Sequence, residues 1–102
     1  MAKLYVTEYS DVPSAYAAAA MQTVREPPIG DQMPVTIGAS AASSLPFSGR
    51  TTIVRLNTDS ICSIAIGPPP QTATTNNQRL AANQTEYKLV VPGHVVSVIA
   101  NT

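Results

Sequence analysis

Hydrophobic and polar residues alternate along several short segments of the chain, which is the pattern of β-strands with one buried face. In the first of these segments, Leu4 and Val6 alternate with tyrosine and threonine residues. Turn residues separate the later segments at intervals typical of an antiparallel sandwich or barrel. The segments are residues 3–9, 51–57, 60–66, 84–91 and 94–100. We therefore predict an all-β protein, a small antiparallel β-sandwich.

Turn sequences predict how these strands are connected. Residues 57–60, Asn-Thr-Asp-Ser, lie between two strand segments, so they predict a tight turn and a hairpin. Pro92 and Gly93 fit the two central positions of a type II turn before the last strand. Residues 67–78 contain three consecutive prolines and few apolar side chains, so we expect an exposed loop that tolerates insertions.

The N-terminal third has a different character. Residues 10–33 contain a run of alanines and then a proline-rich turn. Alanine favours a helix, but an isolated helix of fewer than about 12 residues is marginal in water, so residues 14–24 could be helical or extended. We interpret residues 1–33 as a strand followed by an extended arm, and residues 34–102 as the sandwich body of a single domain.

The charge of the chain argues against two classes of partner. Six Lys and Arg balance six Asp and Glu, and charged residues make up only 12% of the 102 residues. A neutral chain has no long-range field to attract nucleic acid, and its arginines are too widely spaced for a basic patch. No apolar stretch approaches the roughly 20 residues that span a bilayer, and the N-terminus lacks the apolar run of a secretion signal. We expect neither a nucleic-acid nor a membrane partner.

Residues with catalytic or metal-binding chemistry are few. The only cysteine and the only histidine, Cys62 and His94, cannot form a zinc site, which takes about four ligands, or a disulfide within the chain. Cys62 alternates in phase with Ile64 and Ile66, which indicates a small buried side chain rather than a nucleophile. The carboxylates are scattered without the spacing of an acid–base pair or a calcium loop. The sequence predicts no catalytic residue, no cofactor and no metal.

Some apolar side chains are candidates for contacts with other proteins. Tyr5 and Tyr9 share a face of the first strand, where tyrosine suits an interface, although the same rings could equally pack on the protein's own core. A body of about 70 residues without a disulfide or metal builds only a small core, so association would supply further burial. The candidate interface residues, including those of the arm, are Tyr5, Tyr9, Tyr16, Met21, Val24 and Ile29.

The order of strands and turns also carries a family resemblance over most of the chain. The stretches concerned are residues 2–8, 25–29, 60–67, 79–87, 92–93 and 96–102. In these stretches the sequence resembles small structural proteins encoded among the capsid genes of tailed bacteriophages. The likeness consists of the order of strand and turn segments in a β-sandwich and contains no motif of catalytic or ligand-binding residues.

The resemblance implies a jelly-roll-like sandwich and a non-enzymatic role in the virion. It implies a decoration or cement protein, made in the host cytoplasm, that binds the major capsid protein on the outside of the head as a trimer. A neck, tail or head-fibre subunit is the alternative within the virion. A small host-directed binding protein is an alternative of a different class.

Overall fold

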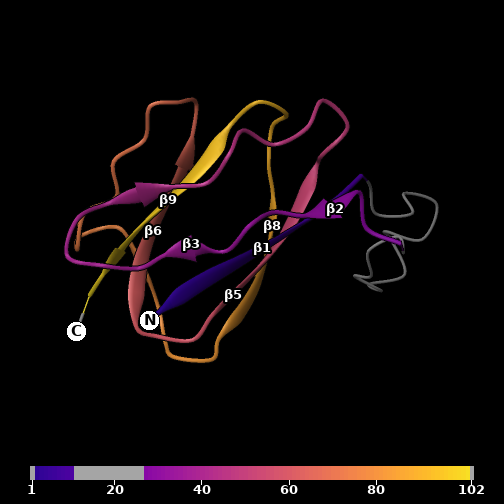
Figure 1. The fold of residues 1–102 in the computed structure, drawn as a ribbon. Coiled ribbons are helices and arrows are strands. Elements are labelled where there is room, and N and C mark those ends of the chain that lie inside the picture. Colours follow the sequence, from indigo (N-terminus) through magenta and orange to yellow (C-terminus); the bar gives the residue numbers. More distant parts are fainter. Residues whose placement is uncertain (1, 11–26, 102) are drawn as a thin grey trace, which may run out of the picture.

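The computed structural model describes residues 2–10 and 27–101, and every regular element in this part of the chain is a β-strand (Figure 1). The strands form two antiparallel sheets. The first sheet has the order β2-β1-β5-β8, with β3 also paired to β1, and the second has the order β4-β9-β6-β7. The predicted antiparallel β-sandwich is confirmed. The strands are β1 (Lys3–Tyr9), β2 (Gly30–Asp31), β3 (Val35–Thr36), β4 (Ala42–Ser43), β5 (Ile53–Thr58), β6 (Cys62–Gly67), β7 (Gln78–Leu80), β8 (Thr85–Leu89) and β9 (Val95–Ala100).

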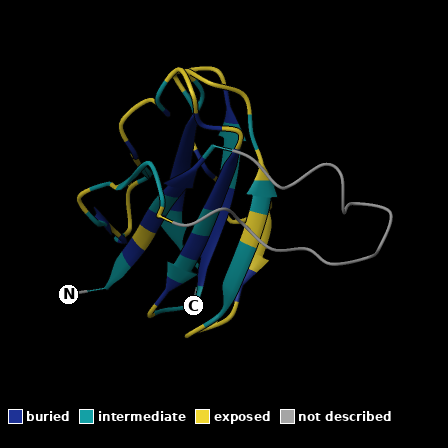
Figure 2. Cartoon of the chain, turned by 90° about the vertical axis from the view of Figure 1, so that its right-hand side faces the viewer, coloured by how far each residue is buried: buried dark blue, intermediate teal, exposed yellow. Residues whose placement is uncertain are grey.

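The hydrophobic core lies between the two sheets. The predicted alternation of the strands supplies it, because every second residue of the central strands β1, β5, β6 and β9 is turned toward the opposite sheet. Buried residues are gathered on the strands, whereas most exposed residues lie on the connecting loops (Figure 2). The central strands' members of this core are Leu4, Val6, Val54, Leu56, Cys62, Ile64, Val96 and Val98.

The first strand is part of the folded body. β1 lies between β5 on one side and the short strands β2 and β3 on the other, with a six-residue register against β5. The Ile29 N–H donates a hydrogen bond of 2.7 Å to the carbonyl oxygen of Glu8, so the chain leaves β1 at Ser10 and is again beside it at Ile29. The body therefore includes β1 and β2 as well as the residues from 34 onward. The greater part of the predicted arm, residues 11–26, lies outside the described residues.

The predicted hairpin between residues 51–57 and 60–66 is wrong. β5 pairs with β1 and β8 in the first sheet, whereas β6 pairs with β7 and β9 in the second. The turn is present, because the Thr58 hydroxyl donates to the Ser60 carbonyl at 2.6 Å and accepts from the Ser60 N–H. It carries the chain across the sandwich, so that the apolar faces of the two strands pack on each other instead of their edges forming hydrogen bonds.

The loop after β6 is more firmly attached than the sequence predicts. Residues 68–70 are exposed as expected, but Ala73 is buried and its N–H donates to the Ser97 hydroxyl on β9 at 2.9 Å. Asn101 donates from its amide both to Ser63 on β6 and to the Thr75 carbonyl. The loop therefore covers small serine side chains on the outside of the second sheet, a docking mode that needs no large apolar residue.

The predicted turn before the last strand is confirmed. Gly93 has a φ of +87°, a backbone conformation that glycine adopts without the steric cost of a Cβ atom. The His94 N–H donates to the Val91 carbonyl at 3.1 Å, which closes the turn. The chain then enters β9.

Candidate protein-binding face

The first sheet has an outer face, formed by the side chains that point away from the second sheet. Leu4 and Val6 enter the core, so the alternate residues of β1 point outward, and directly paired residues of β5 and β8 lie on the same face. The residues of the outer face are Tyr5, Thr7, Tyr9, Ile53, Arg55, Asn57, Thr85, Tyr87 and Leu89.

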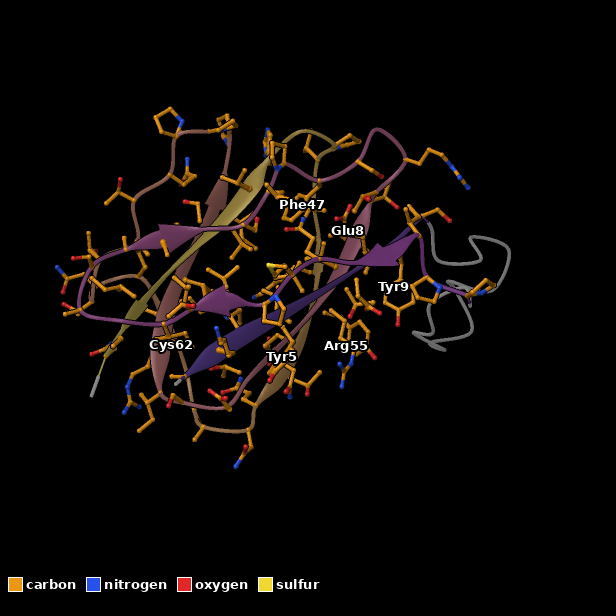
Figure 3. The ribbon with its side chains drawn as sticks, viewed as in Figure 1. Tyr5, Glu8, Tyr9, Phe47, Arg55 and Cys62 are labelled. Carbon is orange, nitrogen blue, oxygen red and sulfur yellow. The ribbon has the colours of Figure 1, made fainter. Side chains whose placement is uncertain are left out.

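Large apolar side chains are exposed on this outer face. Leu89 is 82% exposed, Tyr87 55% and Tyr5 43%, and Val91 extends the same alternation beyond β8. Arg55 is the one charged residue of the face. On β5 it lies directly opposite Thr7 of β1 on one side and Tyr87 of β8 on the other (Figure 3 labels Arg55 and Tyr5). Tyrosine and arginine are the residue types enriched at the centres of protein interfaces. The outer face therefore has the composition of a protein-binding surface.

The candidate interface residues from the sequence have different positions. Tyr5 is exposed on the outer face, whereas Tyr9, four residues further along the same strand, is buried. Ile29 is partly buried beside the end of β1. The arm candidates Tyr16, Met21 and Val24 lie outside the described residues.

Sequence reasoning missed Arg55, Tyr87 and Leu89 as candidates for the interface. Alternation did show that Tyr87, Leu89 and Val91 share one face of their strand. The missing information was the position of β8 at the edge of its sheet. At an edge, polar residues can point inward and reach solvent between the sheets, so the apolar residues of the same strand can point outward.

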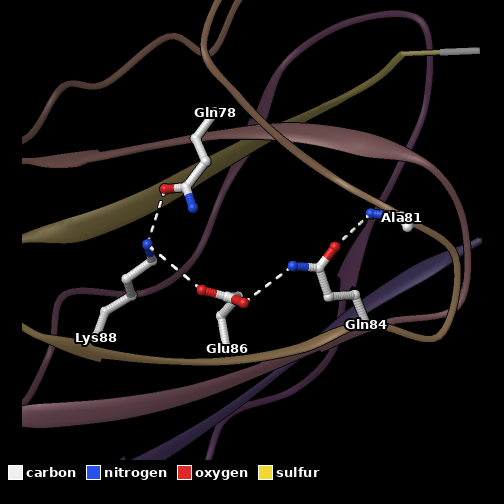
Figure 4. A network of polar contacts seen from close by, with 5 residues as sticks. All are labelled: Gln78, Ala81, Gln84, Glu86 and Lys88. Carbon is white, nitrogen blue, oxygen red and sulfur yellow. Dashed lines mark hydrogen bonds and ion pairs between the residues drawn. The ribbon is translucent and has the colours of Figure 1, made fainter.

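The inward-pointing residues of β8 close the side of the sandwich where β8 and β7 form the edges. The Lys88 ammonium donates to the side-chain oxygen of Gln78 on β7 at 2.8 Å and lies 3.8 Å from the Glu86 carboxylate (Figure 4). Gln84 donates to Glu86 at 2.9 Å and accepts from the Ala81 N–H at 2.7 Å. This polar network connects the two sheets at an edge where apolar residues would remain partly exposed.

A second polar cluster surrounds Glu8, near the C-terminal end of β1. The carboxylate is 8% exposed, and its Oε1 accepts from the Thr51 hydroxyl at 2.5 Å and from the Ser48 N–H at 2.9 Å. Its Oε2 accepts from the amide of Gln32 at 2.9 Å, and that amide also bonds both backbone groups of Leu45. Glu8 therefore attaches the segments on either side of it to β1, which is the role of a structural rather than a solvent-exposed acid.

The two residues with nucleophile and base chemistry are far apart. Cys62 is paired with Ala100, the last residue of β9, whereas His94 precedes the first residue of that strand. This separation along β9 is about 20 Å. Residues 2–10 and 27–101 contain no group of three His, Cys, Asp or Glu side chains that could hold a metal ion.

Cys62 has the electrostatics of a core residue. The thiol is fully buried and donates to the Thr58 hydroxyl across 3.6 Å. Burial raises the pKa of the Cys62 thiol above its ordinary value, an effect that the hydrogen bond with Thr58 opposes and the nearby Asp59 carboxylate reinforces. The side chain is therefore held as the neutral thiol, which is the unreactive form.

Changing Cys62 to alanine is expected to reduce the pH dependence of stability at alkaline pH. The unfolded chain loses the thiol proton above about pH 8.5, before the folded protein does, so the free energy of unfolding falls as pH rises through that range. Denaturant unfolding at about pH 7 and 9.5 should show a larger loss for the wild type than for Cys62→Ala. Tyrosine ionisation is common to both proteins, so an equal loss in both would contradict the assignment.

Comparison with protein-family models, with curated proteins and with solved structures found no match to this chain. A search of the described residues for a helix long and apolar enough to cross a membrane also found none.

Proposed function

We propose that this chain is a non-enzymatic structural protein of a bacteriophage virion, a decoration or cement protein that stabilises the head through protein–protein contacts. Its partner is the major capsid protein or another protein of the virion, it acts on the capsid surface after synthesis in the host cytoplasm, and the family resemblance favours a trimer. The exposed outer face of the first sheet is the observation that carries this proposal.

The outer face supports protein binding because the side chains of Tyr5, Tyr87 and Leu89 remain in contact with water in the isolated chain, although Tyr9 and Ile53 on the same face are buried. Leu89 and Tyr87 lie side by side with Arg55 on rigid strands rather than on loops, so little conformational entropy is lost when they are covered. Backbone pairing with β5 fixes Tyr87 opposite Arg55. A partner surface that places apolar groups over the tyrosines and a carboxylate opposite Arg55 would complement this face.

The order of the strands supports a virion component by analogy. Of the strands that follow β2, β3, β5 and β8 belong to the first sheet, and β4, β6, β7 and β9 belong to the second. In the first sheet, β1 lies between β3 and β5. This is the order of a jelly roll whose closing strand is the first of the chain instead of the last. Jelly rolls recur in viral capsid domains, although also in lectins and cupins, so the fold raises the expectation without deciding it.

The copy number of the protein in purified virions tests the proposal. A decoration protein covers the head, so gel densitometry against the major capsid protein should give hundreds of copies per particle. Tens of copies would favour the neck, tail or head-fibre alternative. Absence from particles whose other structural proteins are all present would contradict a virion role and favour the host-directed binding protein.

A further inference from the structure

We propose that two copies of this chain associate through their β8 strands, which pair antiparallel about a two-fold axis at Tyr87 and join the two first sheets into one. This inference goes beyond the proposed function and rests on separate observations. They are the open edge of β8, the direction of its backbone groups and the order of charges along it.

β8 lies at the edge of the first sheet, and within the described residues its only strand partner is β5. Its backbone groups alternate between the two sides. The Val90 N–H donates to the Thr52 carbonyl, and the Gln84 carbonyl accepts from the Thr58 N–H, so the even-numbered residues are bonded toward β5. By the alternation of an antiparallel ladder, the N–H and C=O groups of Thr85, Tyr87 and Leu89 point toward the open edge. A strand that pairs there would satisfy them.

The charge order along β8 selects the partner. The strand reads Thr-Glu-Tyr-Lys-Leu from residue 85 to residue 89, with a carboxylate and an ammonium on either side of Tyr87. In an antiparallel pairing centred on Tyr87, Glu86 of each copy lies directly opposite Lys88 of the other. Opposite charges at directly paired positions stabilise a sheet, and like charges there destabilise it. The strand is therefore complementary to a second copy of itself.

The same charges specify the register. A two-fold axis perpendicular to the sheet keeps the outer faces of both copies on the same side. One residue of β8 must then lie directly opposite the same residue of the other copy, and the register is defined by which residue this is. Centring the axis on Glu86 would place two carboxylates opposite each other, and centring it on Lys88 would do the same with two ammonium groups. The register centred on Tyr87 avoids both repulsions and places Leu89 opposite Thr85 of the other copy.

The outcome of this pairing is an interface of modest size. β8 has five residues, about 17 Å of strand, so the contact should be weak and should depend on protein concentration. It would bring the two outer faces together into one continuous surface with both Tyr87 side chains at its centre. In a trimeric decoration protein the same two-fold contact would link neighbouring trimers.

Charge variants test the pairing in the isolated full-length chain, without virions. Glu86→Lys alone and Lys88→Glu alone each place like charges opposite each other in a homodimer, so each should weaken the association measured by sedimentation velocity about tenfold or more. Mixing the two variants restores both opposite-charge pairs, so the mixture should form a heterodimer with close to wild-type affinity. Arg50→Glu, an exposed loop variant with the same charge change as Lys88→Glu, is the control and should associate normally.

A cysteine pair tests the register directly. Cα atoms of directly opposed residues lie about 5.5 Å apart, within disulfide range, so Tyr87→Cys should form a covalent dimer on mild oxidation. Leu89→Cys is the matched control, because the two copies of residue 89 would be about 13 Å apart along the strands although Leu89 is more exposed than Tyr87. Circular dichroism verifies that each variant is folded. A wild type that stays monomeric up to millimolar concentration, single variants that associate normally, a mixture that stays monomeric, or equal cross-linking at both positions would each overturn the proposal.

Discussion

Replacing Glu8 by alanine is expected to lower the free energy of unfolding by about 3 kcal/mol or more. The carboxylate accepts hydrogen bonds from Gln32, which follows β2, and from Ser48 and Thr51, which precede β5. Alanine would remove the shared acceptor of the buried Thr51 hydroxyl, the part-buried Ser48 N–H and the Gln32 amide. The Gln32 amide keeps a hydrogen bond to the Leu45 carbonyl and the Thr51 hydroxyl keeps its contact with the Ser48 hydroxyl, so the Ser48 N–H is the donor left unsatisfied, at a cost of about 1 to 3 kcal/mol, and the lost hydrogen bonds to a charged acceptor supply the rest. Small domains have little stability in reserve, so this single change should unfold a substantial fraction of the protein under mild denaturing conditions.

A graded series separates the hydrogen bonds of Glu8 from its volume. Glu8→Gln keeps the size but turns an amide N–H toward the amide of Gln32, so we expect a loss of about 1 to 2 kcal/mol. Thr51→Val removes one donor without changing the shape and should cost about 1 kcal/mol. The exposed carboxylate of Asp31 provides the control, because Asp31→Asn should change stability by less than about 0.5 kcal/mol.

Denaturant unfolding followed by circular dichroism measures this series. The expected order of stability is wild type, Thr51→Val, Glu8→Gln and then Glu8→Ala. A Glu8→Ala protein that loses less than about 1 kcal/mol would show that water replaces the carboxylate without cost, and the cluster would then be incidental to the fold.

The sequence predicted the strands well because their alternation reflects the burial of one face. β5, β6 and β9 lie within a residue or two of the predicted segments, and Val54, Leu56 and Ile64 are buried as their spacing required. The same logic identified Cys62 as a core residue, and it is fully buried. Periodicity is local, and these properties depend only on local spacing.

Connections between strands were less predictable, because alternation does not distinguish a hairpin from a crossing between sheets. The turn after Thr58 satisfies the same residue preferences in both cases, and only the partners of β5 and β6 decide between them. Likewise, few apolar side chains in residues 67–78 suggested an exposed loop, although the small Ala73 and the serine hydroxyl of β9 were sufficient to dock it. Long-range partners were therefore the missing information in both cases.

Which face of β8 points toward the core could not be predicted from the sequence, for a related reason. A strand with Tyr87 and Leu89 on one side and Glu86 and Lys88 on the other would usually bury the apolar side. In the structure the charged side faces inward, because Lys88 can reach Gln78 across the open side of the sandwich. The candidate face could be predicted only in part, since Tyr5 came from the sequence and its neighbours on β5 and β8 came from the sheet register.

Removing two exposed side chains from the outer face is expected to weaken attachment to phage heads at least about tenfold. In the variant Tyr5→Thr combined with Leu89→Thr, threonine retains the β-strand preference and the charge is unchanged, so stability should change by less than about 1 kcal/mol. Binding to heads that lack the protein can be measured by co-sedimentation over a range of protein concentrations.

Single variants separate this surface from the others on the molecule. Tyr5 lies on β1, with β5 between it and β8, so Tyr5→Thr alone should reduce attachment to heads while leaving self-association through β8 intact. Leu45 is 68% exposed in the segment between β4 and β5 and belongs to none of the strands that form the outer face, so Leu45→Thr removes a similar apolar group and should bind normally. Equal losses for the Leu45 and outer-face variants would indicate non-specific adhesion of apolar groups.

Undiminished attachment of the double variant would exclude the outer face as the surface that holds the protein on the head, because a bound interface centred on Tyr5 and Leu89 could not lose both side chains without losing affinity.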